Sequence, residues 1–416
     1  MKQTFFSKVK ERALFIWKIP SFPSLFLINF IFGLSSSFFL PFSSIFGIDE
    51  AKMSNIEFGI FMTITALGAV FISSYLARLS DTNTSRKRLL ILTSAAGVIG
   101  YSLYAFLRNY YALSLTGFFI LGASAGTIPQ LWAYARDALK SANIPNEEAP
   151  LIMNVFRMFF ALSWTAGPAI GSVLLMKTGF TGLFLFVAAG YLLALVTIIF
   201  LLKDISNQKV SADKPPMVKT YIKRPYISGY LAAAFMLSAA TSIHMLNIPQ
   251  FVTKALHGSE LDVGLVFSVP PIFEVPFMVI VGILATKINN AILIRIAFSI
   301  AFIYFSMIGF VKEPWQILPL QILSAAQISV TAGIAISFFQ DLIPEAPGMA
   351  TTLYMNTTQI GSTIGYLMFG FISEAISYRS VITVYTVMAG VGVLCQFLLA
   401  KEKQEVPNSI PTKASS

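Results

Sequence analysis

The sequence is short of charged residues for its length. Asp, Glu, Lys and Arg make up 12% of its 416 residues, whereas a typical soluble domain carries about 25%. Hydrophobic residues reach 56%, and the mean hydropathy is +0.74. This shortage of charge argues against a soluble globular protein and indicates a chain embedded in a lipid bilayer.

Cysteine and histidine are scarce as well. The one cysteine, Cys395, lies in an apolar run, which excludes an intrachain disulfide framework or a cysteine metal site. With two histidines and no nucleophile or metal-ligand constellation, a membrane-embedded enzyme is disfavoured, so we expect no metal and no cofactor. His244 falls near the outer end of an apolar run, where an interfacial position is expected rather than a functional one.

The apolar runs are about 20 residues long, the length that a helix needs to cross a bilayer. Strands of a membrane barrel would be about half as long and would alternate in polarity. The runs therefore predict an all-α membrane protein with twelve transmembrane helices. They lie at 22–46, 57–79, 87–107, 111–135, 151–176, 180–202, 226–252, 262–285, 291–311, 315–340, 348–374 and 380–400.

One long polar segment divides the twelve spans into two sets of six. It covers 203–225, with paired prolines and no apolar periodicity, which is typical of a linker. We therefore expect a six-helix bundle over 1–202, a cytoplasmic linker, a second six-helix bundle over 226–400 and a cytoplasmic tail over 401–416.

The positive charges are distributed unequally between the loops. With the N-terminus inside, 22 Lys and Arg residues fall on the cytoplasmic side and 6 on the outside, and Arg157 is left within a span. Cytoplasmic loops carry such an excess, so both termini are expected inside the cell. This asymmetry also accounts for the net charge of +10 without a nucleic-acid partner. The basic N-terminal segment lacks a small-residue cleavage site and is expected to be retained.

The two sets of spans repeat each other at a common offset. Glu57-Phe-Gly59 corresponds to Asp262-Val-Gly264 at an offset of 205, and Met153-Asn154 corresponds to Met355-Asn356 at 202. Two six-helix repeats in parallel orientation are the layout of major facilitator transporters.

The loop after the second span resembles the cytoplasmic gating loop of the major facilitator superfamily. Asp81, Arg86 and Lys87 match that motif, while Ala77 and Thr84 replace its glycines. An acid near a helix end and an Arg cluster can form charge-assisted bonds that hold one side of a transporter shut. Arg136 and Asp137, after the fourth span, are assigned to the same gate. The alternative is an ordinary basic cytoplasmic loop.

Residues 161–172 resemble the fifth-helix signature that accompanies exporters in this superfamily. Gly167, Pro168 and Gly171 match, whereas Ser163 and Ser172 stand where glycines are usual. The alternative is a helix-packing seam, which small residues support equally well.

Arg157 and Glu274 are charges inside predicted spans. Arg157 lies about 10 Å from the inner face and Glu274 about 18 Å from the outer face, so the two share nearly one depth in a core about 30 Å thick. We expect the two side chains to meet in one conformation and to couple proton binding to the transition. A permanent structural ion pair is the alternative. The prolines around Glu274, at positions 270, 271 and 276, predict a broken helix.

Several uncharged polar or aromatic residues lie inside spans and suit a neutral polar substrate, because amides donate and accept hydrogen bonds and aromatic faces stack on sugar rings. For any single one of them, a bond between helices is the competing explanation. These candidates are Asn29, Gln130, Trp164, Asn247, Gln327, Asn356 and Gln359.

Together these features resemble the bacterial sugar efflux transporters of the major facilitator superfamily. The resemblance is carried in the first half by 75–81, 129–136 and 157–168 with 179–181, and in the second half by Gly264, residues 274–276 and Gly282. It implies a monomeric inner-membrane protein that exports glucose- or lactose-like sugars by proton antiport through alternating access, with Arg157 and Glu274 as functional positions. Multidrug export is the alternative within transport, and a structural or sensory membrane protein is the alternative outside it.

Overall fold

A computed structural model describes residues 16–17, 19, 21–82, 85–145, 148–204 and 224–399, without the side chains of 77–82, 150–151 and 399. The regular structure of this part is helical throughout, which confirms the predicted all-α class. The first half holds α2 (Phe22–Phe39), η1 (Leu40–Phe42), η2 (Ile45–Glu50), α3 (Asn55–Thr82), α4 (Arg86–Phe106), α5 (Tyr110–Leu115), η3 (Thr116–Leu121), α6 (Gly122–Ser124), α7 (Thr127–Ser141) and α8 (Ala149–Leu201). The second holds α10 (Pro225–Gln250), η4 (Phe251–Ala255), α11 (Glu260–Ala285), α12 (Asn290–Ile308), η5 (Pro314–Gln316), α13 (Ile317–Leu342), α14 (Pro347–Ala375) and α15 (Tyr378–Leu399).

Ten helices of the described chain are long and apolar enough to cross a membrane. One of them, Ile152–Leu201, has 50 residues and is long enough for two crossings. Gly179 interrupts it with φ 63° and ψ −173°, a conformation that glycine adopts readily and other residues avoid. The 29-residue α14 is less apolar and adds a further long helix. Every predicted span therefore has a helical counterpart, and the chain is a multi-pass membrane protein.

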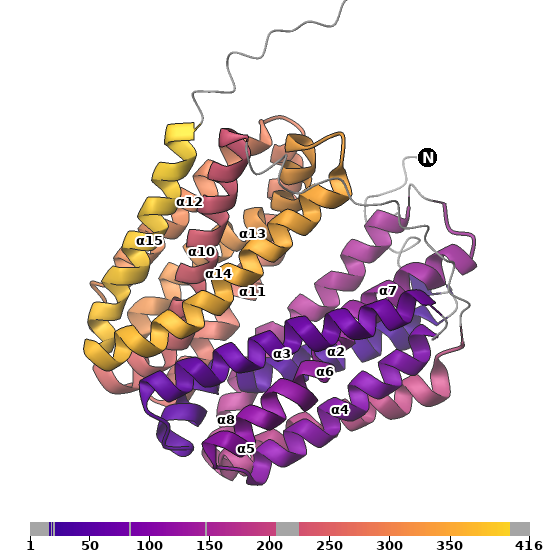
Figure 1. Cartoon of the computed structure of the whole chain (residues 1–416), viewed down its shortest axis with the longest axis horizontal. Helices are drawn as coiled ribbons and strands as arrows, with labels where there is room; N and C mark the ends of the chain where they lie inside the picture. Colours follow the sequence, from indigo (N-terminus) through magenta and orange to yellow (C-terminus); the bar gives the residue numbers. More distant parts are fainter. Residues whose placement is uncertain are drawn as a thin grey trace, which may run out of the picture.

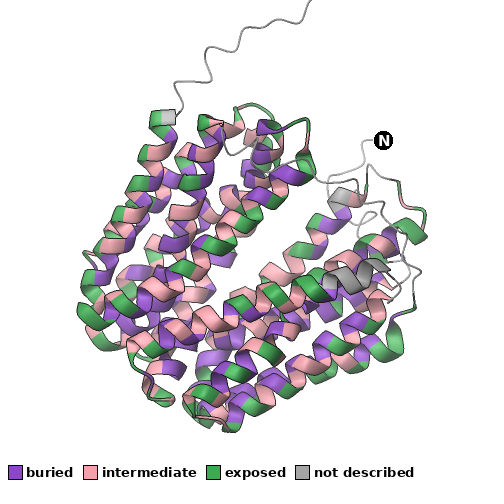
Figure 2. Cartoon of the chain, in the orientation of Figure 1, coloured by how far each residue is buried: buried purple, intermediate pink, exposed green. Residues whose placement is uncertain are grey.

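Exposed residues follow the outward faces of the helices (Figure 2). Many of them are large and apolar. Phe71, Phe200 and Phe310 expose 63%, 78% and 83% of their surfaces. In water such surfaces would be unfavourable, but lipid tails are as apolar as these side chains. These faces are therefore suited to contact with the bilayer.

The helices form two groups that diverge from a shared contact (Figure 1). In the first group α2 packs on α8, and α4 packs on α8 as well. In the second group α10 packs on α14 and α15, and α12 packs on α13 and α15. The helices α2 and α10, the first of each group, therefore occupy equivalent central positions, as two repeats require. Nearly all the predicted linker and the tail lie outside the described residues.

The two groups meet at one end, where α3 packs on α14 and α8 packs on α11. At Gly59 of α3 an added Cβ would lie 2.7 Å from the Cα of Gly370 in α14. At Gly264 of α11 an added Cβ would lie 2.7 Å from the carbonyl oxygen of Pro168 in α8. We call this the closed end, and the opposite end, where α8 finishes and α10 begins, the linker end. Gly59 and Gly264 are the glycines that the sequence repeat brought into register.

The prediction of a broken helix around Glu274 is wrong. Helix α11 runs unbroken from Glu260 to Ala285 through Pro270, Pro271 and Pro276. Packed membrane helices tolerate proline, because neighbouring helices and Ser or Thr side chains supply partners to freed backbone groups. Helix α13 also supports this stretch of α11, because the Ser329 hydroxyl donates to the backbone oxygen of Glu274 at 3.1 Å.

Candidate functional site

A cavity of about 330 Å³ lies where the first helical group meets the second, and we call it the central cavity. Helix α8 contributes Phe160, Ala161 and Trp164 to its wall. The rest comes from the second group: Thr241, His244, Met245 and Ile248 of α10, Val266, Phe267, Pro270, Pro271 and Glu274 of α11, Tyr304 and Phe305 of α12, and Gln321, Ser324, Gln327 and Ile328 of α13. Its volume is in the range of small-molecule sites, and it combines aromatic surface with a few converging polar groups.

Glu274 brings a carboxyl group to the wall of this cavity. Within the described residues it has no ion-pair partner within 4 Å, and the titratable neighbours that share its cavity are His244 and Tyr304. A carboxyl group without a fixed cationic partner can change its protonation state without breaking an ion pair. Its position is therefore suited to proton exchange.

Arg157 does not pair with Glu274 in this conformation. Its guanidinium carbon lies 5.1 Å from the centre of the Trp132 ring, and its side chain is exposed. Arg157 precedes Phe160 of the cavity wall by almost one helical turn, on the side of the linker end. The structure thus places Arg157 on the linker-end side of the central cavity and Glu274 in its wall.

Trp164 offers an unused hydrogen-bond donor. Its ring lines the central cavity, and its Nε1 is buried without a hydrogen-bond partner among the described residues. A buried N–H without a partner costs roughly 1–3 kcal/mol. A polar ligand that accepts this bond would remove the penalty, while the ring supplies apolar contact.

His244 is a member of the site that sequence analysis missed. The expectation that it lies at the membrane interface is wrong, because it lines the central cavity, and its Nε2 is 3.1 Å from the Tyr304 hydroxyl. Tyr304 in turn donates to Gln321 at 3.3 Å. The π-helical segment η4 carries the chain past the end of α10, so His244 lies deeper than the apolar pattern indicated. The available signal was the recurrence of polar residues at every third position of α10, at Ser238, Thr241, His244 and Asn247.

The other predicted substrate residues divide between the cavity and the helix interfaces. Gln327 lines the central cavity, like Trp164. Asn29 bridges helices by donating to the Phe156 oxygen at 2.6 Å and accepting from Trp132 at 3.3 Å. Asn247 donates to the Tyr378 oxygen at 3.0 Å. Gln130 is buried, and its Oε1 has no partner among the described residues. Asn356 and Gln359 are exposed on α14 and line neither the central cavity nor the smaller cavity inside the second group.

The predicted gate residues lie at the linker end of the first group. Arg86 of α4 forms an ion pair with Asp137 of α7. Lys87 donates to the carbonyl oxygen of Leu202 at 2.6 Å, just past the end of α8. The C-terminus of a helix stabilises a positive charge. Arg136 is exposed, and the side chain of Asp81 lies outside the described residues. These contacts join α4, α7 and α8 to one another and do not cross to the second group.

The Gly-Pro-x-x-Gly run of α8 contacts a helix on each side. An added Cβ at Gly167 or Gly171 would collide with α2, at Ser37 and Phe38. On the other side the Ala169 amide donates to the Ser268 hydroxyl of α11 at 3.0 Å. Both pairings need small residues for close approach of the backbones.

A polar network secures the closed end, and no feature of the sequence had indicated it. Gln250, fully buried in α10, donates to the Asp49 carboxylate at 2.9 Å, and Lys254 lies 2.7 Å from the same carboxylate. Nearby, the Tyr378 hydroxyl donates to the side-chain oxygen of Asn55 at 3.0 Å, and the backbone N–H of Asn55 donates to the Glu374 carboxylate at 3.0 Å. All of these bonds connect the first helical group to the second.

The comparisons with known proteins agree with this architecture. Residues 25–347 and 230–415 match the family model of the Major Facilitator Superfamily. Sugar efflux transporter C of Escherichia coli K12 is 29% identical over 371 residues, which cover 89% of this chain and 93% of that protein. A relative from Deinococcus radiodurans, whose name also describes sugar efflux, is 30% identical over 366 residues, which cover 87% of this chain and 94% of its own.

A crystal structure of the nucleoside transporter NupG shares the fold. It superimposes with a TM-score of 0.80 at 14% identity, and the match covers 90% of this chain and 98% of NupG. The family model, the relatives and the solved structure that match this chain all describe transporters. The chain therefore belongs to the sugar efflux transporters of the Major Facilitator Superfamily.

Proposed function

We propose that this protein exports small neutral sugars or glycosides across the bacterial inner membrane in exchange for protons. The observation that carries the proposal is that Trp164, with its free N–H donor, and Glu274, with its carboxyl group, line the same cavity of about 330 Å³. The names of the relatives above, which describe sugar efflux, support the same substrate class.

The lining of the cavity suits a sugar better than an ion. Gln321, Gln327 and Ser324 can donate to and accept from hydroxyl groups, and the faces of Trp164 and Phe160 offer a surface for the apolar side of a pyranose. Among the described residues that line the cavity, none is a lysine or an arginine. Recognition would therefore depend on neutral hydrogen bonds and stacking.

Coupling would arise from Glu274 and its relation to Arg157. In the present conformation the closed end is sealed and the two groups diverge toward the linker end, which the topology of positive charges makes cytoplasmic. Rocking of the two groups would close the linker end, where Arg86 and Asp137 lie, and bring α8 nearer to α11. Arg157 would then approach Glu274 and stabilise its deprotonated form. A proton taken up from the outer side would break this contact and favour return to the present conformation, in which the proton leaves toward the linker end. The proposed transporter works as a monomer with both termini in the cytoplasm.

Equilibrium dialysis with radiolabelled sugars tests the substrate class. Purified full-length protein should bind lactose, glucose or a thiogalactoside, and Trp164→Phe should weaken binding roughly fivefold, the value of one hydrogen bond of about 1 kcal/mol. Trp315→Phe is the matched control, because Trp315 lies outside the cavity and exposes 63% of its surface. Binding of lipophilic cations, with none of the sugars, would overturn the proposal in favour of multidrug export, for which a relative named MdtG, from Serratia proteamaculans and 22% identical, offers a precedent.

A further inference from the structure

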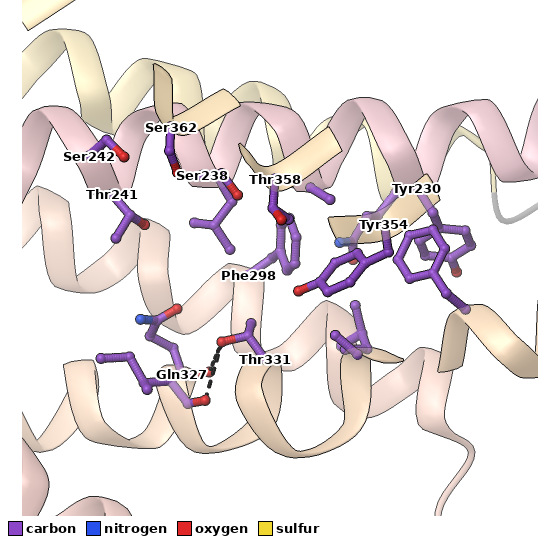
Figure 3. A pocket seen from close by; sticks show the side chains of 17 residues that line it. Tyr230, Ser238, Thr241, Ser242, Phe298, Gln327, Thr331, Tyr354, Thr358 and Ser362 are labelled. Carbon is purple, nitrogen blue, oxygen red and sulfur yellow. Dashed lines mark hydrogen bonds between the residues drawn. The ribbon is translucent and has the colours of Figure 1, made fainter. Parts of the chain in front are cut away.

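A second cavity, of about 210 Å³, lies inside the second helical group between α10, α13 and α14 (Figure 3). It shares Thr241, Gln327 and Ile328 with the central cavity, so these residues form a common wall between the two spaces. We call it the side cavity. The transport cycle proposed above does not use this cavity.

The side cavity is elongated along α10 toward the linker end. Figure 3 shows Ser242 and Thr241 at one end of it and Tyr230 and Tyr354 at the other. Positions 230 and 242 of α10 are about 18 Å apart at the rise of an α-helix. Tyr230 lies in the second turn of α10 and Tyr354 in the second turn of α14, both near the linker end. The cavity therefore extends from its common wall with the central cavity toward the linker end.

Its lining is neutral and rich in hydroxyl groups. Ser238 faces it from α10, Thr331 from α13, and Thr358 and Ser362 from α14 (Figure 3). None of the described residues in the lining carries a charge. Serine and threonine hydroxyls both donate and accept hydrogen bonds. A neutral row of such groups suits water molecules and gives no anchor for an ion.

The buried amide of Gln396 in α15 favours polar occupants of this space. Its side chain lines the side cavity and is 1% exposed, and both its Oε1 and its Nε2 lack hydrogen-bond partners among the described residues. Burying an amide without partners costs several kcal/mol in an apolar medium. Buried polar cavities of this kind hold water, for which room above about 15 Å³ is sufficient. The available volume is many times larger, yet it is below the range of about 300–1,000 Å³ that is typical of ligand sites.

We propose that the side cavity holds a chain of waters that carries protons between Glu274 and the linker-end face, separately from the route of the substrate. The inference rests on the proposed function, in which Glu274 exchanges protons. The O–H bond of protonated Glu274 breaks as its proton passes to a water, each water passes one proton onward, and the excess proton reaches bulk water at the linker end. Thr241 and Gln327, in the common wall, can hydrogen-bond water on either side.

A separate proton route would explain how antiport proceeds with substrate bound. A sugar in the central cavity would cover the Glu274 carboxyl group on the cavity side. The side cavity meets the central cavity at Thr241, Gln327 and Ile328, on the side of α10 and α13. Water there would give the proton a way to the linker end that the sugar does not occupy. Besides Glu274, the titratable groups along this path are His244 and Tyr304 in the central cavity and Tyr230 and Tyr354 in the side cavity.

The first test measures hydration and requires no proton coupling. In a Cys395→Ala background, Ser238→Cys places a thiol in the side cavity, and Ser306→Cys places one on the lipid side of α12. Ag⁺, an ion close to water in size, should react with the cysteine at 238 at least tenfold faster than with the cysteine at 306, measured as loss of maleimide labelling after unfolding. Equal rates at the two positions would overturn the proposal.

The second test measures the proton route in proteoliposomes. Ser238→Leu obstructs the side cavity, Gln396→Leu removes its unpartnered amide, and Ser306→Leu is the matched control. We expect the first two to slow sugar-driven proton movement at least tenfold while sugar–sugar exchange, which needs no net proton transfer, stays within twofold. If Gln396→Leu or a folded Ser238→Leu moves protons at the native rate, the proton route is overturned. If the native protein exchanges sugar but moves no protons, proton antiport itself fails and the route fails with it, whereas the Ag⁺ result still reports the hydration.

Discussion

Lys254 and Asp49 form a 2.7 Å ion pair that joins the two helical groups across the closed end. The same carboxylate accepts a hydrogen bond from Gln250, whose side chain is fully buried. The two contacts differ in environment, since 52% of the Lys254 side chain is exposed. Exposed ion pairs contribute about 0–1 kcal/mol, whereas hydrogen bonds to charged groups contribute about 1.5–3 kcal/mol. The buried bond is therefore the stronger of the two.

This difference predicts how strongly each of the two contacts of Asp49 stabilises the closed end. Asp49→Ala should shift the population toward states that are open at the closed end by about tenfold, the equivalent of about 1.4 kcal/mol. Lys254→Ala should shift it less than threefold. The population is measured as the thiol accessibility of an introduced Asn55→Cys, which lies at the closed end against Glu374 of α14. Equal effects of the two substitutions would contradict this ranking.

Gly59 should be essential for closure, because an added Cβ would lie 2.7 Å from the Cα and 2.9 Å from the amide nitrogen of Gly370. Backbone atoms cannot yield as a flexible side chain does. Gly59→Leu should therefore hold the closed end open and slow transport at least tenfold, while Gly282→Leu, where a Cβ meets nothing within 4 Å, should leave it near normal. Distances between spin labels on α3 and α14 would show whether the two helices move apart at the closed end. An unchanged distance in Gly59→Leu would refute the prediction.

The Arg86–Asp137 ion pair should stabilise the first helical group, because both side chains are less than 20% exposed. Removing one partner of a largely buried pair leaves the other charge poorly solvated. Asp137→Asn should therefore lower the Tm of the purified protein by several degrees. Arg88→Gln is the control, since Arg88 is exposed in the same turn of α4 and should change the Tm by less than a degree. Similar shifts for both would mean that this ion pair has no particular structural role.

Glu345 should make the linker end of the second group slightly sensitive to acid. A bond to its own backbone amide and the Arg224 guanidinium, 2.8 Å away, hold the pKa of Glu345 below its usual value. A carboxyl group with a depressed folded-state pKa stabilises the fold above its unfolded pKa of about 4.3, and this contribution is lost as the pH falls through the folded-state value. Both side chains are about two-fifths exposed, so the effect should be small and should weaken with salt. The Tm of Glu345→Gln should fall less steeply than that of the native protein below about pH 4.3, and parallel curves would exclude this role.

Much of the fold follows from the sequence, because helix length and hydropathy are dictated locally by the bilayer. The repeat put Gly59 in register with Gly264, and the structure places both at contacts between the groups, a role that the repeat by itself did not predict. The unbroken α11 was not predictable in this way, because whether proline breaks a membrane helix depends on the neighbours that supply hydrogen bonds.

The site was predictable only in part. Glu274, Trp164 and Gln327 stood out as polar or aromatic residues inside spans, and they line the central cavity. Asn29 and Asn247 stood out equally but hold helices together, and a sequence does not show which face of a helix points to a cavity. His244 and Gln396 were overlooked because their depth and their lack of partners are tertiary properties.

The most direct test of sugar–proton antiport uses inside-out vesicles with a pH-sensitive dye in the lumen and an acid-inside gradient. Addition of lactose, glucose or a thiogalactoside to the native protein should alkalinise the lumen as sugar enters and protons leave. Glu274→Gln should abolish this proton movement while sugar–sugar exchange continues. Sugar-driven proton movement that survives in Glu274→Gln would contradict the role of this carboxyl group, and no response of the native protein to any sugar would contradict the transport assignment itself.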